Sequence, residues 1–279
     1  LSEETIKIYR HYLTEFLDSL DAGDVYKSLY NLSPEDIHAF FIRSAKGRAD
    51  TTRGQIRAAL RSFLSFCAKH GHIPHDLATA LPKISRYKLA DVPRAVGEDD
   101  ARKLLENIDR TTLVGRRDFA IVQLLYTYGV RSAQVRALRL QDIQWRMNRI
   151  RFPACKGGKE VLAPLTDEVG ERLLDYLRDG RSQAPYSEVF LTVRAPFRPL
   201  EAGGLYRIVA GRMRRAGVGG SAVGPHSLRH AFATRFLKHN QSLKTIADML
   251  GHRTINSTFI YTKIDFAMLK HLPLEWPEV

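Results

Sequence analysis

The sequence predicts a mainly helical protein of two domains, with one small antiparallel sheet in the second. Three observations carry this expectation. Apolar residues recur every three or four positions through most of the chain, which is the spacing of amphipathic helices. The stretch 81–97 loses that spacing and contains Pro82, Pro93 and Gly97, which is typical of a linker. Two β-rich runs, 149–152 and 161–163, flank a Gly-Gly pair that favours a tight turn. We therefore expect domains at 1–83 and 98–279, joined by a linker at 84–97.

The first domain is expected to hold three helices. The first follows Ser2 and presents an apolar stripe of Ile6, Tyr9, Leu13, Phe16, Leu17 and Leu20. The second begins at Ser33-Pro34, because a capping serine and a proline in the first turn mark a helix start. The third runs from about Thr52 to Lys69.

A row of basic residues accompanies the third helix. It comprises Arg43, Lys46, Arg48, Arg53, Arg57 and Arg61, and only Asp50 offsets these six charges within the segment. Arg53, Arg57 and Arg61 recur at every fourth position, about a quarter turn from the apolar stripe of the same helix. The pattern favours contact with phosphates, while a solvated face is the ordinary alternative.

The second domain is expected to begin with helices over 98–107 and 118–128. The latter is apolar on nearly all sides and is predicted to be buried. Gly129 suits the left-handed residue that ends such a helix. A short helix and the hairpin follow, and Thr166 is the expected cap of a helix to about Arg178. We expect a further strand at 188–192 and helices at 205–216, 227–238 and 242–250.

Charge and composition restrict the class of protein. The 279 residues carry a formal net charge of +13 and a pI near 9.9, which indicates a polyanionic partner, although some proteins are simply basic. Residues 1–90 hold 13 basic and 10 acidic residues and the remainder 30 and 20, so most of the excess lies in the second domain. No apolar run is long enough to span a membrane, and the start of the chain lacks a signal pattern. With two cysteines, Cys67 and Cys155, no disulfide framework is expected and the protein is predicted to be cytoplasmic.

The second domain also contains a set of residues suited to phosphodiester chemistry. Its members are Arg131 after the Gly129 cap, Lys156 and Lys159 on the hairpin turn, His226 and Arg229 at a helix start, His252 after Leu250-Gly251, and Tyr261. Arginines neutralise phosphate oxygens, histidines and lysines move protons, and a tyrosine hydroxyl can attack phosphorus. Side-chain cations supply the charge that metal ions supply elsewhere, so neither a metal nor a cofactor is expected.

These motifs resemble the tyrosine recombinases, the phage-integrase-type site-specific recombinases. The matching stretches are TYGVRSAQVRALRLQDI, CKGGKEVLAPL, GPHSLRHAFATRFLKHNQSLKTIADMLGH and STFIYTK. The resemblance implies a helical, SAM-like core-binding domain and a mostly helical catalytic domain that together clamp duplex DNA. It further implies a homotetramer on two recombination sites, near the nucleoid, that exchanges strands through a Holliday junction without ATP.

The resemblance also implies a role for each residue of the set. Arg131 and Arg229 would hold the scissile phosphate, and His252 would donate a hydrogen bond to a non-bridging oxygen. Lys156 would protonate the leaving 5′ oxygen, with Lys159 as the alternative acid, and His226 would assist proton transfer. Tyr261 would be the nucleophile and form a 3′-phosphotyrosyl link.

The sequence departs from the family pattern at three places. Gln134 stands where an acidic residue is usual, Cys155 where glycine is common, and Lys263 where histidine is frequent. A carboxylate at position 134 would orient and pair with active-site groups, so its absence is expected to weaken that support. Gln134 and the tail containing Trp276 favour a mobile-element integrase or transposase over an Xer-type dimer resolvase. Two competing interpretations of the chain are a catalytically silent DNA-binding protein and a type IB topoisomerase.

Two further segments can each be interpreted in two ways. The run CAKHGHIPH, with Cys67, His70, His72 and His75, resembles a metal site, but its spacing better fits a helix end that enters a loop. The tail 264–279 ends with Leu272, Leu274 and Trp276, which is too apolar for a free segment. As in the family, we expect it to dock on a neighbouring protomer; packing on its own domain is the alternative.

Overall fold

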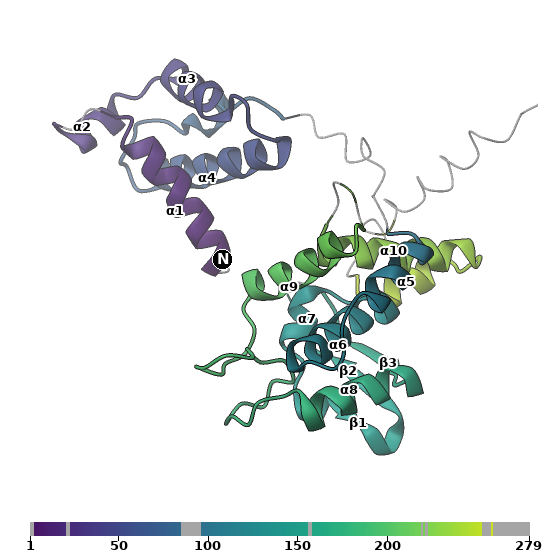
Figure 1. Ribbon diagram of the computed structural model, residues 1–279. Helices are drawn as coiled ribbons and strands as arrows, with labels where there is room; N and C mark the ends of the chain where they lie inside the picture. The colour runs from purple at the N-terminus through teal and green to yellow at the C-terminus, as the bar shows by residue number, and fades with distance from the viewer. Residues whose placement is uncertain are drawn as a thin grey trace, which may run out of the picture. The chain divides into compact units, whose positions relative to one another are not determined.

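The computed structural model describes residues 3–20, 23–84, 96–155, 158–218, 220, 223–252 and 258 (Figure 1). The chain forms two compact units, residues 1–87 and 88–279. Within the described residues no helix is long and apolar enough to cross a membrane. The linker predicted at 84–97 falls largely outside the described residues.

The first unit is a bundle of helices around one core. Its elements are α1 (Glu3–Leu17), α2 (Val25–Tyr30), α3 (Pro34–Ala45), α4 (Asp50–Lys69) and the 3₁₀ turn η1 (Leu77–Ala80). The long helix α4 packs on α1, α3 and η1. Phe16 of α1 meets Phe40 of α3 edge to face, with ring centroids 5.0 Å apart.

The start of α3 confirms the expected capping signal. The Ser33 hydroxyl accepts a hydrogen bond from the Asp36 backbone N–H, and the Asp36 carboxylate accepts one from the Ser33 backbone N–H. The sequence does not predict the helix α2. It has six residues and buries only Leu29, so it lacks the apolar stripe that reveals longer helices.

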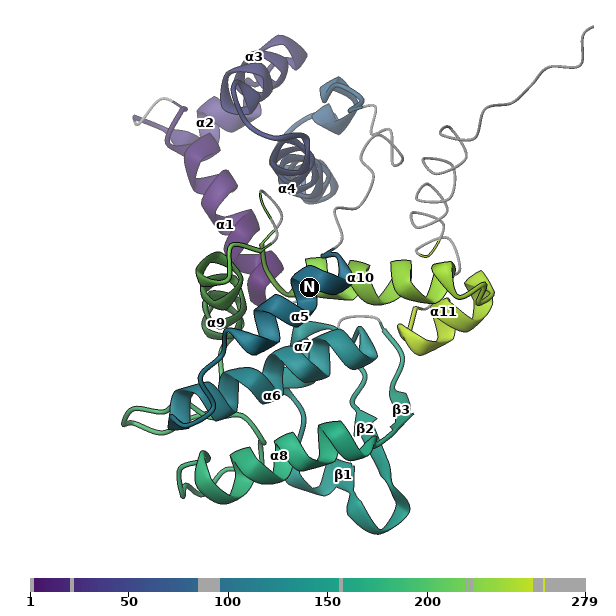
Figure 2. The ribbon, with the colours of Figure 1, turned by 45° about the vertical axis from the view of Figure 1, so that its right-hand side comes forward.

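The second unit surrounds the buried helix α6. Its elements are α5 (Glu98–Glu106), α6 (Leu113–Tyr128), α7 (Ser132–Arg136), η2 (Leu140–Asp142), β1 (Ile143–Gln144), η3 (Trp145–Met147), β2 (Arg149–Phe152), β3 (Val161–Pro164), α8 (Asp167–Asp179), α9 (Ala202–Arg215), α10 (Pro225–Lys238) and α11 (Leu243–Met249). α6 packs on α5, α7, α8, α9 and α10. Figure 2 shows α8 beside α6 on the side of the sheet, and α9 and α10 on the other side.

The sheet has the order β1-β2-β3 and is antiparallel throughout. The predicted hairpin is confirmed, with Arg149 opposite Pro164 and Phe152 opposite Val161. Strand β1 is not predicted by the sequence because it contains two residues. Helix α6 begins five residues before the predicted start, because the Thr112 hydroxyl caps it by accepting from the Gly115 N–H at 3.0 Å.

The strand predicted at 188–192 is wrong. In its place the structure has two isolated bridges, Arg139 with Glu188 and Leu191 with Pro199. The side chain of Arg181 donates to the carbonyls of Glu188 and Val189, at 3.0 and 3.1 Å. These two carbonyls therefore accept from the Arg181 guanidinium and not from the backbone N–H groups of a neighbouring strand.

Candidate active site

Arg131 is held at the junction between α6 and α7. Gly129 ends α6 with the predicted left-handed backbone (φ +59°), and Arg131 is the N-cap residue of α7. Its Nη1 atom donates to the carbonyls of Leu250 and Gly251, at 3.3 and 3.2 Å. These bonds hold the guanidinium of Arg131 against the C-terminal end of α11.

Arg229 reaches the same carbonyl from α10. Gly224 precedes this helix, and Pro225 is its first residue. The Arg229 side chain is 5% exposed; its Nη2 donates to the Leu250 carbonyl at 2.9 Å and its Nη1 to the Gly129 carbonyl at 2.7 Å. Two arginines far apart in the sequence therefore converge on one oxygen. The carbonyls orient the two guanidiniums, and two guanidiniums held side by side suit the binding of an anion such as a phosphate.

His252 follows α11 on a turn made by Gly251 (φ +61°). Its ring is buried, and Nδ1 lies 2.7 Å from the Thr258 hydroxyl. Burial, with the positive charges of Arg229 and Arg131, lowers the pKa of His252 to about 4, so the ring is neutral at physiological pH. In the tautomer whose Nδ1 accepts the Thr258 proton, Nε2–H is left as a hydrogen-bond donor.

His226 lies in the first turn of α10, three residues before Arg229. Its side chain still reaches solvent. Desolvation by surrounding atoms, then the charges of Arg229 and Arg131, lower the pKa of His226. A neutral histidine near two guanidiniums can accept a proton from a reacting hydroxyl.

Two glycines allow the hairpin loop to approach this centre. A Cβ on Gly158 would lie 2.5 Å from Nη1 of Arg131, and one on Gly251 would lie 2.9 Å from Cγ2 of Val161. The backbone N–H of Lys159 donates to the Gly251 carbonyl at 3.2 Å. The loop after β2 and the turn after α11 thus contact each other and both contact the guanidinium of Arg131. The Lys159 side chain is exposed.

The structure brings together Arg131, Arg229, His226 and His252 as a single cluster. Lys156 and Tyr261 lie outside the described residues, as does the tail 264–279. Sequence reasoning missed Thr258, because a lone threonine six residues after a histidine carries no signal. It also missed Gly158 as the residue that makes room for the guanidinium of Arg131.

The basic row of the first unit is only partly as expected. Arg43, Lys46 and Arg61 are exposed, and Arg53 and Arg57 half-buried. Asp50, the acidic residue within the segment, pairs with Arg53, and Glu15 of α1, outside the segment, also accepts from Arg48 with both oxygens at 3.2 Å. Two surface hollows flank the row, one beside Arg53 and one beside Arg57 and Arg61, and both include Lys83, which the sequence did not single out.

The histidine run at the end of α4 forms a stack of rings. Phe66 and His70 lie 4.1 Å apart between centroids, and the His70 and His72 rings are nearly parallel. Cys67 is buried in the core. Across the part of the chain that the structure describes, no three His, Cys, Asp or Glu residues group as ligands for a metal.

An arginine pair with two neutral histidines is typical of an enzyme that acts on a phosphodiester. Comparison with known proteins agrees. Residues 94–268 match the phage integrase family, and residues 1–71 match the N-terminal SAM-like domain of phage integrases. The chain belongs to the phage integrase family, the tyrosine recombinases, whose members cleave and rejoin DNA strands.

Relatives of known sequence include both integrases and Xer proteins. Protein y4rA of Sinorhizobium fredii, by its name a candidate integrase/recombinase, is 39% identical over 279 residues, 99% of this chain and 67% of that protein. A second candidate from that organism, y4rF, is 36% identical, and the alignment covers 81% of this chain and 54% of y4rF. Tyrosine recombinase XerD of Listeria innocua is 30% identical over 275 residues, 97% of this chain and 91% of XerD.

Solved structures share the fold. XerH bound to its difH substrate after cleavage has a TM-score of 0.78 at 22% identity, covering 98% of this chain and 80% of XerH. The Tn1549 transposon integrase with transposon end DNA has a TM-score of 0.68 at 16% identity, covering 97% of this chain and 95% of the integrase.

Proposed function

We propose that the protein is a site-specific DNA recombinase that cleaves and rejoins duplex DNA through a 3′-phosphotyrosyl intermediate. The observation that carries the proposal is the convergence of Arg131 and Arg229 on the Leu250 carbonyl, with His252 two residues later. A phosphate beside that oxygen meets both guanidiniums. The negative charge on the phosphate oxygens increases in the transition state, so the two guanidiniums stabilise the transition state more than the bound substrate. Such differential stabilisation by preorganised donors lowers the barrier.

The proposed reaction uses six side chains. The Tyr261 hydroxyl oxygen bonds to phosphorus while the bond from phosphorus to the 5′ oxygen breaks. His226 assists removal of the tyrosine proton, and Lys156 gives a proton to the 5′ oxygen, with Lys159 as the alternative acid. Arg131, Arg229 and His252 hold the non-bridging oxygens. Rejoining reverses these steps with a different 5′ hydroxyl, and the phosphotyrosyl bond conserves the energy.

The test is a nicked suicide duplex that carries a candidate site, from which the short cleaved strand diffuses away. The wild-type protein is expected to form a covalent adduct, and Tyr261→Phe to bind the duplex without forming one. An adduct at wild-type level with Tyr261→Phe would refute the nucleophile. A wild-type protein that binds but never forms an adduct would favour the silent DNA-binding protein.

Contact with the duplex is assigned to the first unit through Arg43, Lys46, Arg48, Arg53, Arg57 and Arg61, together with Lys159 of the hairpin loop. Lys and Arg side chains that neutralise phosphates displace condensed counterions from the duplex, so the affinity for DNA should fall steeply with salt.

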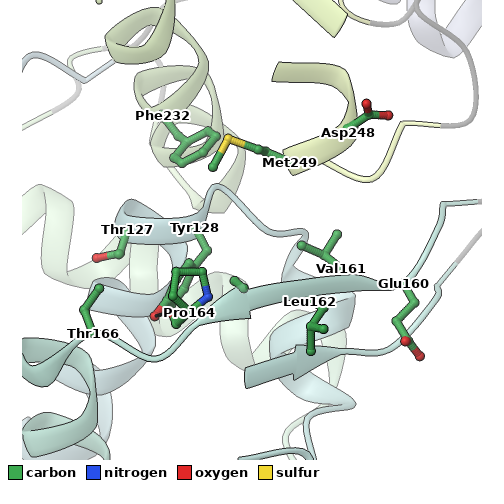
Figure 3. A pocket seen from close by; sticks show the side chains of 11 residues that line it. Thr127, Tyr128, Glu160, Val161, Leu162, Pro164, Thr166, Phe232, Asp248 and Met249 are labelled. Atoms are coloured by element: carbon green, nitrogen blue, oxygen red, sulfur yellow. Dashed lines mark hydrogen bonds between the residues drawn. The ribbon is translucent and has the colours of Figure 1, made fainter. Parts of the chain in front are cut away.

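Assembly on DNA is assigned to a homotetramer in which the tail 264–279 docks on a neighbouring protomer. An apolar cavity of about 420 Å³ between β3, α10 and α11 supports this proposal (Figure 3). Phe232 and Met249 lie on one side of it, and Tyr128, Val161 and Pro164 on the other. The apolar Leu272, Leu274 and Trp276 have the chemistry to fill it.

Removing residues 264–279 should abolish higher-order complexes on paired sites while single-site binding persists. Leu162→Asp, at a half-exposed position of the cavity wall, should weaken assembly in the full chain. Unchanged assembly after the deletion would contradict docking between protomers, and a loss of monomer stability instead would indicate packing on the parent domain.

The biological role we propose is integration or transposition of a mobile element. Gln134 and the Trp276 tail support this role, as does the higher identity to y4rA than to XerD. Joining of two separate DNA molecules at element ends is the expected activity. Accumulation of chromosome dimers after loss of the gene would point to an Xer-type resolvase, and relaxation of any supercoiled plasmid to a topoisomerase.

A further inference from the structure

Gln134 is the buried residue three positions after Arg131. We propose that it is a positioning residue for Lys156, and that its amide holds both ends of the loop carrying this lysine against the start of α7. The inference rests on the proposed function, since Lys156 acts as the acid only in the cleavage reaction described above.

The hydrogen bonds of Gln134 use both ends of its amide. The residue is 0% exposed. Its Oε1 accepts from the backbone N–H of Arg131 at 3.0 Å, and its Nε2 donates to the Pro153 carbonyl at 3.2 Å and, with a longer bond, to the Lys159 carbonyl at 3.5 Å. Both amide hydrogens are therefore used, one for each carbonyl.

The two carbonyls bracket the loop between β2 and β3. Position 153 is three residues before Lys156 and position 159 is three residues after it. The N–H of Lys159 is also fixed, because it donates to the Gly251 carbonyl, which accepts from Arg131 Nη1. The two ends of the loop, at Pro153 and Lys159, are thus tied through Gln134 and Gly251 to Arg131, the residue proposed to hold the phosphate.

Only an amide satisfies this arrangement in its ordinary ionisation state. An ionised carboxylate accepts hydrogen bonds and donates none. At position 134 it would retain the bond from the Arg131 N–H but place a negatively charged oxygen against two carbonyl oxygens in a buried site, which is unfavourable. The glutamine therefore supplies support that the family's acidic residue cannot supply in the same way, which opposes the expectation that Gln134 weakens the site.

The prediction concerns one step, protonation of the leaving 5′ oxygen. When Gln134 is replaced by glutamate, the loop ends are released and Lys156 loses its alignment with that oxygen. Misplacing a catalytic group by about 1 Å costs roughly 100-fold in rate, so a loss of about 10- to 100-fold is expected on a normal duplex.

A sulfur-substituted duplex isolates this step. In a 5′-bridging phosphorothiolate the leaving group is a thiolate, which departs without a proton because thiols ionise near pH ~8.5. On this substrate Gln134→Glu is expected to form the covalent adduct within about threefold of the wild-type rate. Lys156→Ala should show the same rescue, and Arg131→Ala should show none.

Gln123 provides a matched control, since it is a buried glutamine of α6 outside the cluster, 3% exposed. Gln123→Glu introduces the same buried carboxylate, and any effect on adduct formation should be equal on both duplexes. If Gln134→Glu fails to fold, Gln134→Met removes the same bonds without adding charge, and the same rescue by sulfur is expected.

The outcomes separate the two proposals. If the wild-type protein forms an adduct with neither duplex, the proposed function fails. If it forms adducts with both, but the Gln134 variants lose rate equally on oxygen and sulfur or lose none on oxygen, the positioning role of Gln134 is overturned and the proposed function stands.

Discussion

Replacement of Gly129 by alanine tests how the end of α6 supports the active site. Gly129 has φ +59°, and an added Cβ would lie 2.6 Å from the ring of Phe232 on α10. A left-handed alanine costs about 1–2 kcal/mol, and overpacking adds about 1–3 kcal/mol. The free energy of unfolding of the second unit should therefore fall by about 2–5 kcal/mol.

Gly217 is the matched control within the same unit. It has φ +65°, and an added Cβ meets nothing within 4 Å. Gly217→Ala should therefore cost only the backbone strain of about 1–2 kcal/mol. Both tryptophans, Trp145 and Trp276, belong to the second unit, so tryptophan fluorescence during urea unfolding reports on it alone.

Gly129→Ala should also slow cleavage. The added Cβ would push Phe232 away and so shift α10, the helix that carries Arg229. The Gly129 carbonyl, which accepts from Arg229, would shift as well. Gly217→Ala should cleave like the wild-type protein under conditions where both are folded. Equal destabilisation by the two substitutions would refute the steric argument.

Three further predictions concern Asp118, His252 and Arg61, and two of them have a control substitution. Asp118 is buried and accepts from both Arg117 and Arg212, so Asp118→Ala should lower the free energy of unfolding by about 3–5 kcal/mol. The control Glu160→Gln breaks an exposed pair with Arg151, and in the same urea titration it should change the free energy of unfolding by less than about 1 kcal/mol. The pKa of His252 is about 4 in the folded chain, against a reference value of 6.5. The contribution of the neutral ring to stability is therefore complete above pH 6.5 and is lost as the pH falls toward 4. His252→Asn should flatten the pH dependence of the free energy of unfolding between these values, and an unchanged slope would contradict the prediction. Arg61→Ala should reduce the slope of log affinity for duplex DNA against log salt by about 0.9. Arg48→Ala should reduce this slope by less, because Arg48 is already paired with Glu15. A larger effect of Arg48→Ala than of Arg61→Ala would show that Arg61 does not contact the DNA.

Three helix starts with a side-chain cap are predicted from the sequence, whereas the capped starts of α2 and α6 are not. Ser33, Thr166 and Ser242 each accept a backbone N–H of the first turn, and each stands at a helix start that the sequence predicts. The exceptions have local causes. Helix α2 buries a single side chain, and the Glu188 and Val189 carbonyls of the segment 188–192 accept from Arg181.

The membership of the cluster is also predictable, because Arg131, His226, Arg229 and His252 stand at helix ends marked by glycine or proline. Its internal connections are not. The shared acceptor at Leu250, the Thr258 partner of His252 and the amide bonds of Gln134 depend on how distant segments pack, and no local pattern encodes them.

The carbonyl of Leu250 also has a consequence for protein synthesis. Arg131 and Arg229 both precede residue 250 in the chain, so neither guanidinium has this acceptor until residue 250 has been made. A chain interrupted before that point can complete the helices of the first unit and its basic surface, yet it lacks an assembled phosphate site. Truncated products that end before residue 250 should therefore form no covalent adduct with DNA.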